Sequence, residues 1–166
     1  MKIYRTELIS DIQEKLFDIS VNEISIDEIE FYSDKIEGVM SIDCMSNGYH
    51  VKGNLKAPYR LTCDRCLTIF KDLKSVEFDF ILTDDAQLKY DKSDDLIYFP
   101  ISENEFDLNP LFQELIQLEL QMKILCKSDC KGLCSTCGIN LNEKHCECNT
   151  RTNSGVWDKL KNLQGN

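Results

Sequence analysis

Nine cysteines in a chain of 166 residues constrain this sequence more than any other feature. Six of them fall within 23 residues: Cys126, Cys130, Cys134, Cys137, Cys146 and Cys148. The surrounding segment has few large apolar side chains, so it cannot bury a core of its own. In such modules a bound metal ion supplies the missing folding free energy, on the order of 10 kcal/mol. The segment is therefore predicted to fold around metal.

The cysteines are expected to be reduced thiols rather than disulfides. The N-terminus is rich in charged residues and lacks the apolar run of a signal peptide. No apolar stretch approaches the ~20 residues that span a bilayer. We therefore expect a cytoplasmic protein with no membrane partner. In that reducing compartment, clustered cysteines are typical of metal ligation.

Two C-x2-C pairs have the spacing of a metal knuckle. They are Cys63-Asp64-Arg65-Cys66 and Cys134-Ser135-Thr136-Cys137, and Gly138 after the second lets the chain turn without a Cβ clash. With the four other clustered cysteines, the eight thiols are enough for two tetrahedral sites. One arrangement joins the two knuckles around one ion and leaves Cys126, Cys130, Cys146 and Cys148 for a second. Another is a single ion with spare thiols, and the sequence leaves this choice open.

Zinc is the expected cofactor, as one or two ions. The cysteine spacing fits none of the ferredoxin patterns, so an iron–sulfur cluster is the weaker alternative. His145 adjoins Cys146 and could replace a thiol, although a solvated loop residue is the better interpretation. His50 is expected to have a structural role, and Cys44 is expected to be a small buried side chain.

Charge divides the chain into two parts. Residues 1–122 carry 12 Lys and Arg against 25 Asp and Glu, and residues 123–166 carry 7 against 4. We predict an acidic β-rich α+β domain over 1–122 and a cysteine-rich metal-binding module with a short terminal helix over 123–166. The total of −10 is not that of a free-standing nucleic-acid binder. Candidate RNA contacts are therefore confined to basic residues of the tail: Lys127, Lys131, Lys144 and Arg151.

Hydrophobic alternation predicts several strands. Residues 36–57 are typical of a β-hairpin that turns at Ser46-Asn47-Gly48. Further strands are expected over 73–82 and 96–99, separated by a mobile acidic loop over 83–95. The N-terminal segment is less regular, with a short helix expected over 11–17 and a strand over 23–31.

A helix is predicted from Asn109, with Asn109 as its N-cap and Pro110 in the first helical position. The helical spacing of its apolar residues indicates core packing, through Leu108, Leu111, Phe112, Leu115, Leu118 and Met122. The fold class is therefore α+β: an antiparallel β-meander with flanking helices and a C-terminal cysteine-rich zinc module.

The cysteine motifs resemble those of the YceD family, also called DUF177. The resemblance is carried by Cys63-Asp64-Arg65-Cys66-Leu67, by the run from Cys126 to Cys134, by Cys137-Gly138-Ile139-Asn140-Leu141-Asn142 and by Cys146-Glu147-Cys148. Members usually have Pro where this chain has Ser135. They also have Pro ahead of the tail, and since 119–125 contains none, the helix is expected to run further toward Cys126.

The resemblance implies a metal-binding protein that supports accumulation of 23S rRNA, through its synthesis, processing or stability, with no established catalytic activity. We therefore expect a non-enzymatic factor in large ribosomal subunit assembly. Its expected partners are rRNA or a pre-50S particle and basic ribosomal proteins, with no small-molecule substrate. The alternatives are a thiol redox protein that uses Cys63 and Cys66, and a zinc-stabilised protein-interaction adaptor.

Overall fold

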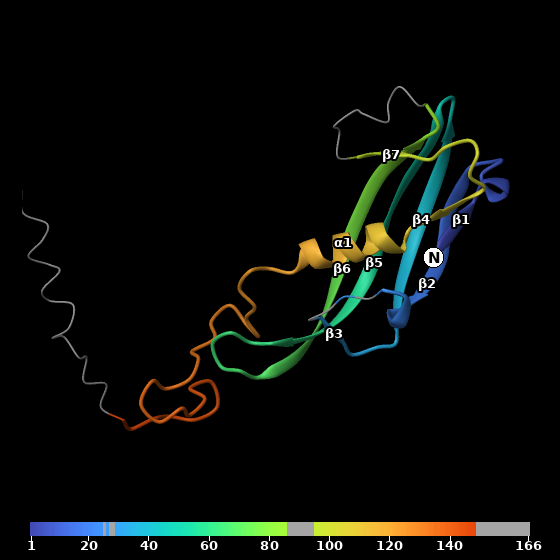
Figure 1. The fold of residues 1–166 in the computed structure, drawn as a ribbon. Coiled ribbons are helices and arrows are strands. Elements are labelled where there is room, and N and C mark those ends of the chain that lie inside the picture. The colour runs from blue at the N-terminus through green and yellow to red at the C-terminus, as the bar shows by residue number, and fades with distance from the viewer. Residues whose placement is uncertain (25, 27–28, 86–94, 149–166) are drawn as a thin grey trace, which may run out of the picture.

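The computed structural model describes residues 1–24, 26, 29–85 and 95–148. Its strands are β1 (Lys2–Tyr4), β2 (Ile12–Ser20), β3 (Glu30–Phe31), β4 (Lys35–Met45), β5 (Gly48–Thr62), β6 (Ile69–Thr83), β7 (Leu96–Tyr98) and β8 (Glu105–Asp107). Two short 3-10 helices cover Arg5–Glu7 and Val21–Glu23, and α1 (Asn109–Glu119) is the single α-helix of the described residues. The protein is therefore mostly β-sheet (Figure 1), and the expected flanking helices reduce to one α-helix in this part of the chain.

The main sheet has the strand order β2-β4-β5-β6-β7, and β3 pairs with β5 beside it. All of these pairs are antiparallel except β6 with β7, which is parallel. The predicted hairpin is confirmed: Met40 lies opposite Gly53 and Ile42 opposite Val51. β1 and β8 form a separate two-stranded sheet.

The core lies between the main sheet and α1, which crosses one face of it (Figure 1). The Phe112 ring stacks on Phe17 at 5.8 Å between centroids and meets Phe78 at 5.2 Å. From β5, the buried Tyr59 hydroxyl donates a 2.8 Å hydrogen bond to the Ile116 carbonyl. This bond and the three rings fix the position of α1 on the sheet.

The helix begins and ends differently from the prediction. Asn109 is its first residue rather than its N-cap, because its N–H donates to the Asp107 carboxylate at 3.0 Å while its side chain accepts a bond from the N-terminal ammonium. Ile116 is buried with Phe112, whereas Leu118 and Met122 of the expected apolar stripe are exposed.

The expected continuation of α1 toward Cys126 is wrong. The helix ends at Glu119, and Leu120 has extended backbone angles. The next residues are held by the loop after β5 instead: Ile124 N–H donates to the Asp64 carboxylate at 2.6 Å, and Asp64 N–H donates to the Ile124 carbonyl at 2.8 Å. These bonds direct the chain from α1 to the first knuckle.

The expectations for the N-terminal region are largely wrong. Residues 11–17 are not helical, because β2 pairs with β4 and places Ile19 in the core. Among the described residues of the strand expected over 23–31, the extended part is Glu30–Phe31, and Glu23 ends a 3-10 helix. Cys44 is exposed rather than buried, since it lies near the end of β4. The acidic loop over 83–95, for the most part, and the terminal helix near Trp157 lie outside the described residues.

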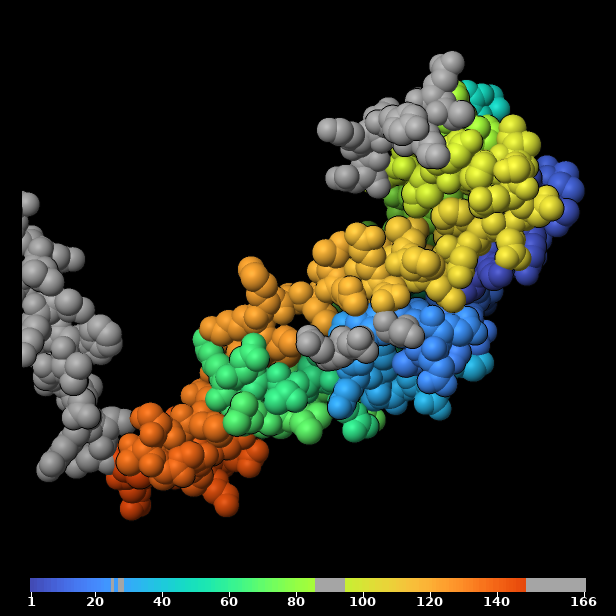
Figure 2. Space-filling view, in the orientation of Figure 1, coloured from blue at the N-terminus to red at the C-terminus, as the bar shows by residue number. Residues whose placement is uncertain are grey.

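Strands β5 and β6 are 15 residues each and extend past the end of α1, so their connection lies at one end of an elongated molecule (Figures 1 and 2). That connection, residues 63–68, contains the first knuckle. The cysteine-rich residues form a separate lobe at the same end (Figure 2). Among the described residues, no helix has the length and apolar character needed to cross a membrane.

Replacing Tyr59 by Phe should lower the free energy of unfolding by about 1 kcal/mol, because a buried hydrogen bond to the end of α1 is lost without loss of ring packing. Urea unfolding of the metal-loaded protein measures this. Tyr49→Phe, at a half-buried tyrosine on the same strand, is the matched control and should change stability less. Equal effects of the two substitutions would contradict this role for the Tyr59 hydroxyl.

Candidate metal centres

The structure brings the eight predicted cysteines together in two groups of four. Site 1 is Cys63, Cys66, Cys126 and Cys130; site 2 is Cys134, Cys137, Cys146 and Cys148. Within each site, all sulfur atoms lie within 4.8 Å of one another. The suggested arrangement with both knuckles around one ion is therefore wrong. Each knuckle joins a different pair of the tail cysteines.

The sulfur spacing fits one tetrahedral ion in each site. Cys63 and Cys130 sulfurs are 3.8 Å apart, and Cys66 and Cys126 sulfurs are 3.6 Å apart. In site 2, the Cys146 sulfur lies 3.4 Å from that of Cys137 and 3.3 Å from that of Cys134. A tetrahedron with zinc–sulfur bonds of about 2.3 Å has sulfur–sulfur edges of about 3.8 Å. These separations are too long for disulfides, and all nine cysteines are free thiols.

The two knuckles have the same backbone hydrogen-bond pattern. In site 1, Cys63 N–H donates to the Thr68 carbonyl at 3.0 Å and Leu67 N–H to the Cys63 carbonyl at 2.9 Å. In site 2, Cys134 N–H donates to Ile139 at 2.9 Å and Gly138 N–H to Cys134 at 2.9 Å. The residue after the second cysteine has a left-handed backbone in both, with φ of 56° at Leu67 and 73° at Gly138. In each knuckle this turn brings the two cysteine sulfurs and the neighbouring backbone N–H groups close to one position, where an ion can bind.

Site 1 joins the end of the sheet to the tail. Cys63 and Cys66 come from the β5–β6 connection, and Cys126 and Cys130 lie about sixty residues later. The Arg65 side chain donates a 2.8 Å bond to the Cys130 carbonyl, and its own carbonyl accepts the Leu133 N–H at 3.1 Å. The tail is thus attached to the knuckle by hydrogen bonds as well as by its thiols.

Two asparagines connect the sites and were not predicted as functional residues. The Asn142 amide donates to the Cys130 sulfur at 3.3 Å and accepts the Lys131 N–H at 2.9 Å. The Asn140 amide donates to Thr68 at 3.3 Å and accepts from Asn142. Such outer groups orient metal ligands. Their sequence signal was their place in the run from Cys137 to Asn142 that carries the family resemblance.

Hydrogen bonds favour thiolates in both knuckles, and in the first knuckle the bonds from Thr68 lower the pKa of Cys66 as well. Burial raises the pKa of Cys63, but backbone N–H groups of Cys126, Cys66 and Arg65 outweigh burial and lower that pKa to about 6. Backbone N–H groups of Cys137 and Thr136 lower the pKa of Cys134 to about 6. Burial and the neighbouring thiols raise the pKa of Cys126 to about 12. Four thiolates at these distances therefore need a cation between them.

The two sites differ in burial. Cys63, Cys66 and Cys130 are buried, whereas Cys137 is exposed and Cys146 and Cys148 are half-buried. His145 is exposed and belongs to neither group. Of the candidate RNA contacts, Lys127, Lys131 and Lys144 are exposed, and Arg151 lies outside the described residues.

Comparison with known proteins decides the family. The family described as "Large ribosomal RNA subunit accumulation protein YceD" matches residues 51–164, which include both candidate sites. The chain belongs to the YceD family. The match covers most of β5, all of β6 and α1, and the whole cysteine-rich region.

Individual relatives match parts of the chain of different length. The chain is 34% identical over 71 residues to the large ribosomal RNA subunit accumulation protein YCED homolog 1, chloroplastic, of Arabidopsis thaliana and 39% identical over 64 residues to its Zea mays counterpart. These alignments span 43% and 38% of the chain but only 22% of each plant protein. An uncharacterized protein of Mycobacterium bovis is 26% identical over 132 residues, 76% of this chain and 60% of the relative. No solved structure gives a significant match.

The geometry predicts two metal ions per chain that are lost separately. Cys63→Ser should remove the ion of site 1, and Cys137→Ser should remove the ion of site 2 and leave site 1 loaded. Native mass spectrometry of each variant measures the stoichiometry, and thiol titration with and without chelator shows which cysteines are protected. Loss of both ions in Cys137→Ser, or a single ion in the unaltered protein, would contradict two independent sites.

Gly132 and Gly138 offer a matched test of how the sites are joined. Both have positive φ, 75° and 73°, so Ala costs about 1 kcal/mol of backbone strain at either position. At Gly132 the added Cβ would also lie 3.1 Å from the Arg65 carbonyl oxygen, whereas at Gly138 nothing lies within 4 Å. Gly132→Ala should therefore lower the thermal stability of the metal-loaded protein more than Gly138→Ala. The reverse order would contradict this packing.

Proposed function

We propose that this protein is a non-enzymatic, zinc-binding factor that supports 23S rRNA synthesis, processing or stability and large ribosomal subunit assembly. The observation that carries the metal assignment is the convergence of four cysteine sulfurs within 4.8 Å at each of two places. The YceD family and its plant relatives are named for accumulation of large-subunit rRNA, which supports the ribosomal role.

Zinc is the ion that this donor set favours. Four thiolates in a closed site are typical of structural zinc, whereas catalytic zinc keeps an open position and uses histidine or carboxylate ligands. An iron–sulfur cluster places several metal atoms between its cysteines, and the short sulfur–sulfur distances here favour a single ion. When bound, zinc supplies folding free energy and holds the tail against the sheet.

The redox alternative is weaker. A redox C-x2-C pair needs an accessible thiolate that is free to exchange with a partner. Both Cys63 and Cys66 are buried, and their sulfurs lie within 4 Å of Cys130 and Cys126. The lowered pKa of Cys63 suits a metal ligand as well as it suits a redox nucleophile, so it does not favour the redox alternative. These contacts support a structural role for the pair.

Basic side chains around the two sites are the proposed contacts with rRNA or a pre-50S particle. Lys127, Lys131 and Lys144 are exposed next to the cysteine ligands. Lys127 has only a loose ion pair with Asp129, at 3.9 Å. The zinc sites would hold these lysines in a defined arrangement, so that metal and RNA binding are coupled through structure. The acidic body, in turn, is proposed to disfavour unspecific RNA and to suit basic ribosomal proteins.

Charge reversal at Lys127 and Lys131 should weaken co-sedimentation with large-subunit precursors several-fold without changing zinc content, because phosphate contacts are lost while the ligands remain. Sedimentation of cell extracts and metal analysis of the purified variant measure the two quantities. Lys2→Glu with Lys52→Glu, two exposed lysines of the sheet domain, is the control with equal charge change. Unchanged association of the Lys127/Lys131 variant, or equal loss in the control, would contradict the proposal.

A further inference from the structure

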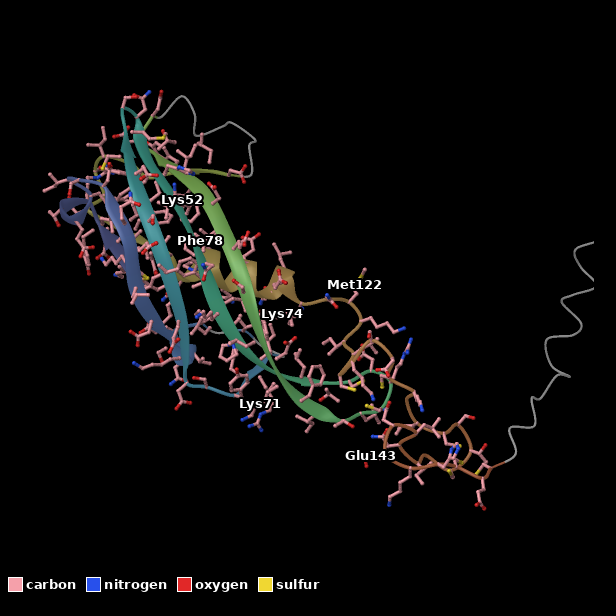
Figure 3. All side chains as sticks on the ribbon, turned by 180° about the vertical axis from the view of Figure 1, so that it is seen from behind. Lys52, Lys71, Lys74, Phe78, Met122 and Glu143 are labelled. Carbon is pink, nitrogen blue, oxygen red and sulfur yellow. The ribbon has the colours of Figure 1, made fainter. Side chains whose placement is uncertain are left out.

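The face of the main sheet opposite α1 is open among the described residues. In β6, Val76, Phe78 and Phe80 point into the core, so the residues between them, Glu77 and Asp79, point to the other side. Figure 3 shows the sheet from this side, with α1 behind it. No other described strand or helix crosses this face in that view.

Charge on the open face is divided along the strands. Toward the β4–β5 turn, Asp79 contacts His50 at 2.6 Å, and Asp43 pairs with Lys52 at 3.1 Å. Toward the cysteine lobe the charged side chains are mostly basic: Lys35, which is paired with Asp18, and Lys56, Arg60 and Lys71. Figure 3 shows Lys52 and Lys71 at these opposite parts of the sheet.

The basic part contains a repulsion that folding alone does not explain. Arg60 and Lys71 lie directly opposite each other on neighbouring strands, and like charges in that position destabilise a sheet. Within the described part of the chain, Lys56, Arg60 and Lys71 form no ion pair within 4 Å. Two carboxylates lie nearby in register, Glu37 opposite Lys56 and Glu30 opposite Arg60. The cations still outnumber them, in a domain that is acidic overall.

A shallow pocket of about 210 Å³ opens beside these cations. It is lined by Tyr32, Ser33, Lys35, Glu37, Lys56, Pro58 and Leu73. Tyr32 is half-buried, its N–H donates to the Pro58 carbonyl at 2.9 Å, and the Lys71 ammonium lies 5.0 Å from its ring centre. Pockets that enclose whole small ligands measure roughly 300–1,000 Å³, so this one suits a single planar group of a larger partner.

We propose that this surface, defined by Tyr32, Lys56, Pro58, Lys71 and Leu73, is a binding platform for single-stranded RNA. One base packs against the half-buried Tyr32 and the exposed Leu73, while Lys56 and Lys71 contact the adjacent phosphates. An aromatic ring between cations on an open sheet is the combination that single strands require. The inference rests on the proposed role in rRNA and extends its contact surface from the tail lysines onto the sheet.

The position of the platform supports RNA over an acidic protein segment. Lys71 is two residues from Ile69, the first residue of β6, which follows the site 1 knuckle, so the platform leads toward the exposed Lys127 and Lys131. A flexible polyanion can follow such a basic path, while the acidic half of the face repels it. An acidic peptide would use the lysines but not the half-buried ring.

The charge contribution is tested by the salt dependence of binding to a fluorescent 12-nucleotide single-stranded RNA. Each lost phosphate contact reduces the slope of log affinity against log salt by about 0.7. Lys56→Gln with Lys71→Gln should therefore make the slope shallower by about 1.4. Lys2→Gln with Lys52→Gln, which removes the same charge elsewhere on the domain, should leave it nearly unchanged. Equal slopes for the two variants would overturn the proposal.

The aromatic contribution is tested at Tyr32. Tyr32→Ala should weaken binding roughly tenfold and Tyr32→Phe much less, because stacking needs the ring and not the hydroxyl. Thermal unfolding of each variant confirms that the sheet is intact. Undiminished binding by Tyr32→Ala would overturn the proposal. A second result would also overturn it: the protein does not bind the RNA but binds a Glu-rich peptide through Lys56 and Lys71. That result would indicate a protein partner.

Co-sedimentation separates this inference from the proposed function. If the unaltered protein associates with large-subunit precursors and the platform variants associate equally well, the platform is wrong and the ribosomal role stands. If the unaltered protein does not associate with large-subunit precursors at all, the proposed function fails, even if the protein binds the RNA oligonucleotide.

Discussion

The convergence of Cys63 and Cys66 with Cys126 and Cys130 is the constraint on which the cysteine-rich end of this protein depends. It joins the tip of the β5–β6 hairpin to a segment about sixty residues away. The segment between α1 and Cys126 forms no helix or strand and has no fully buried side chain, so packing alone holds it weakly. The Asp64–Ile124 hydrogen bonds align that segment, and a metal ion would lock it.

The second site depends on the first for its position. Residues next to the site 2 ligands, rather than the ligands themselves, bond to the β5–β6 connection: Leu133 to Arg65 and Asn140 to Thr68. Gly132 makes the close approach to Arg65 possible, and Asn142 reaches back to the Cys130 sulfur. The sheet therefore fixes the position of site 1, and site 1 fixes the position of site 2. In this proposal, that arrangement places the basic side chains of the tail and of the open sheet face at one end of an otherwise acidic protein.

Local patterns were sufficient to predict the hairpin and the C-x2-C knuckles. The alternation that places Met40 opposite Gly53 lies within one contiguous segment, and a knuckle needs only two cysteines and a left-handed turn. The grouping of the eight thiols was not predictable, because it depends on the path of residues 120–125. That path is determined by the side chain of Asp64, sixty residues earlier. The end of α1 was missed for the same reason, and β2 was missed because its partner β4, not its own periodicity, decides its conformation.

The central claim, that each group of cysteines holds one zinc ion in a closed tetrahedral site, is tested most directly by X-ray absorption at the zinc edge of the purified protein. The account predicts two zinc ions per chain, each with four sulfur neighbours at about 2.3 Å, no nitrogen or oxygen ligand and no second metal nearby. A nitrogen or oxygen neighbour, a metal–metal distance, or zinc in only one site would contradict it.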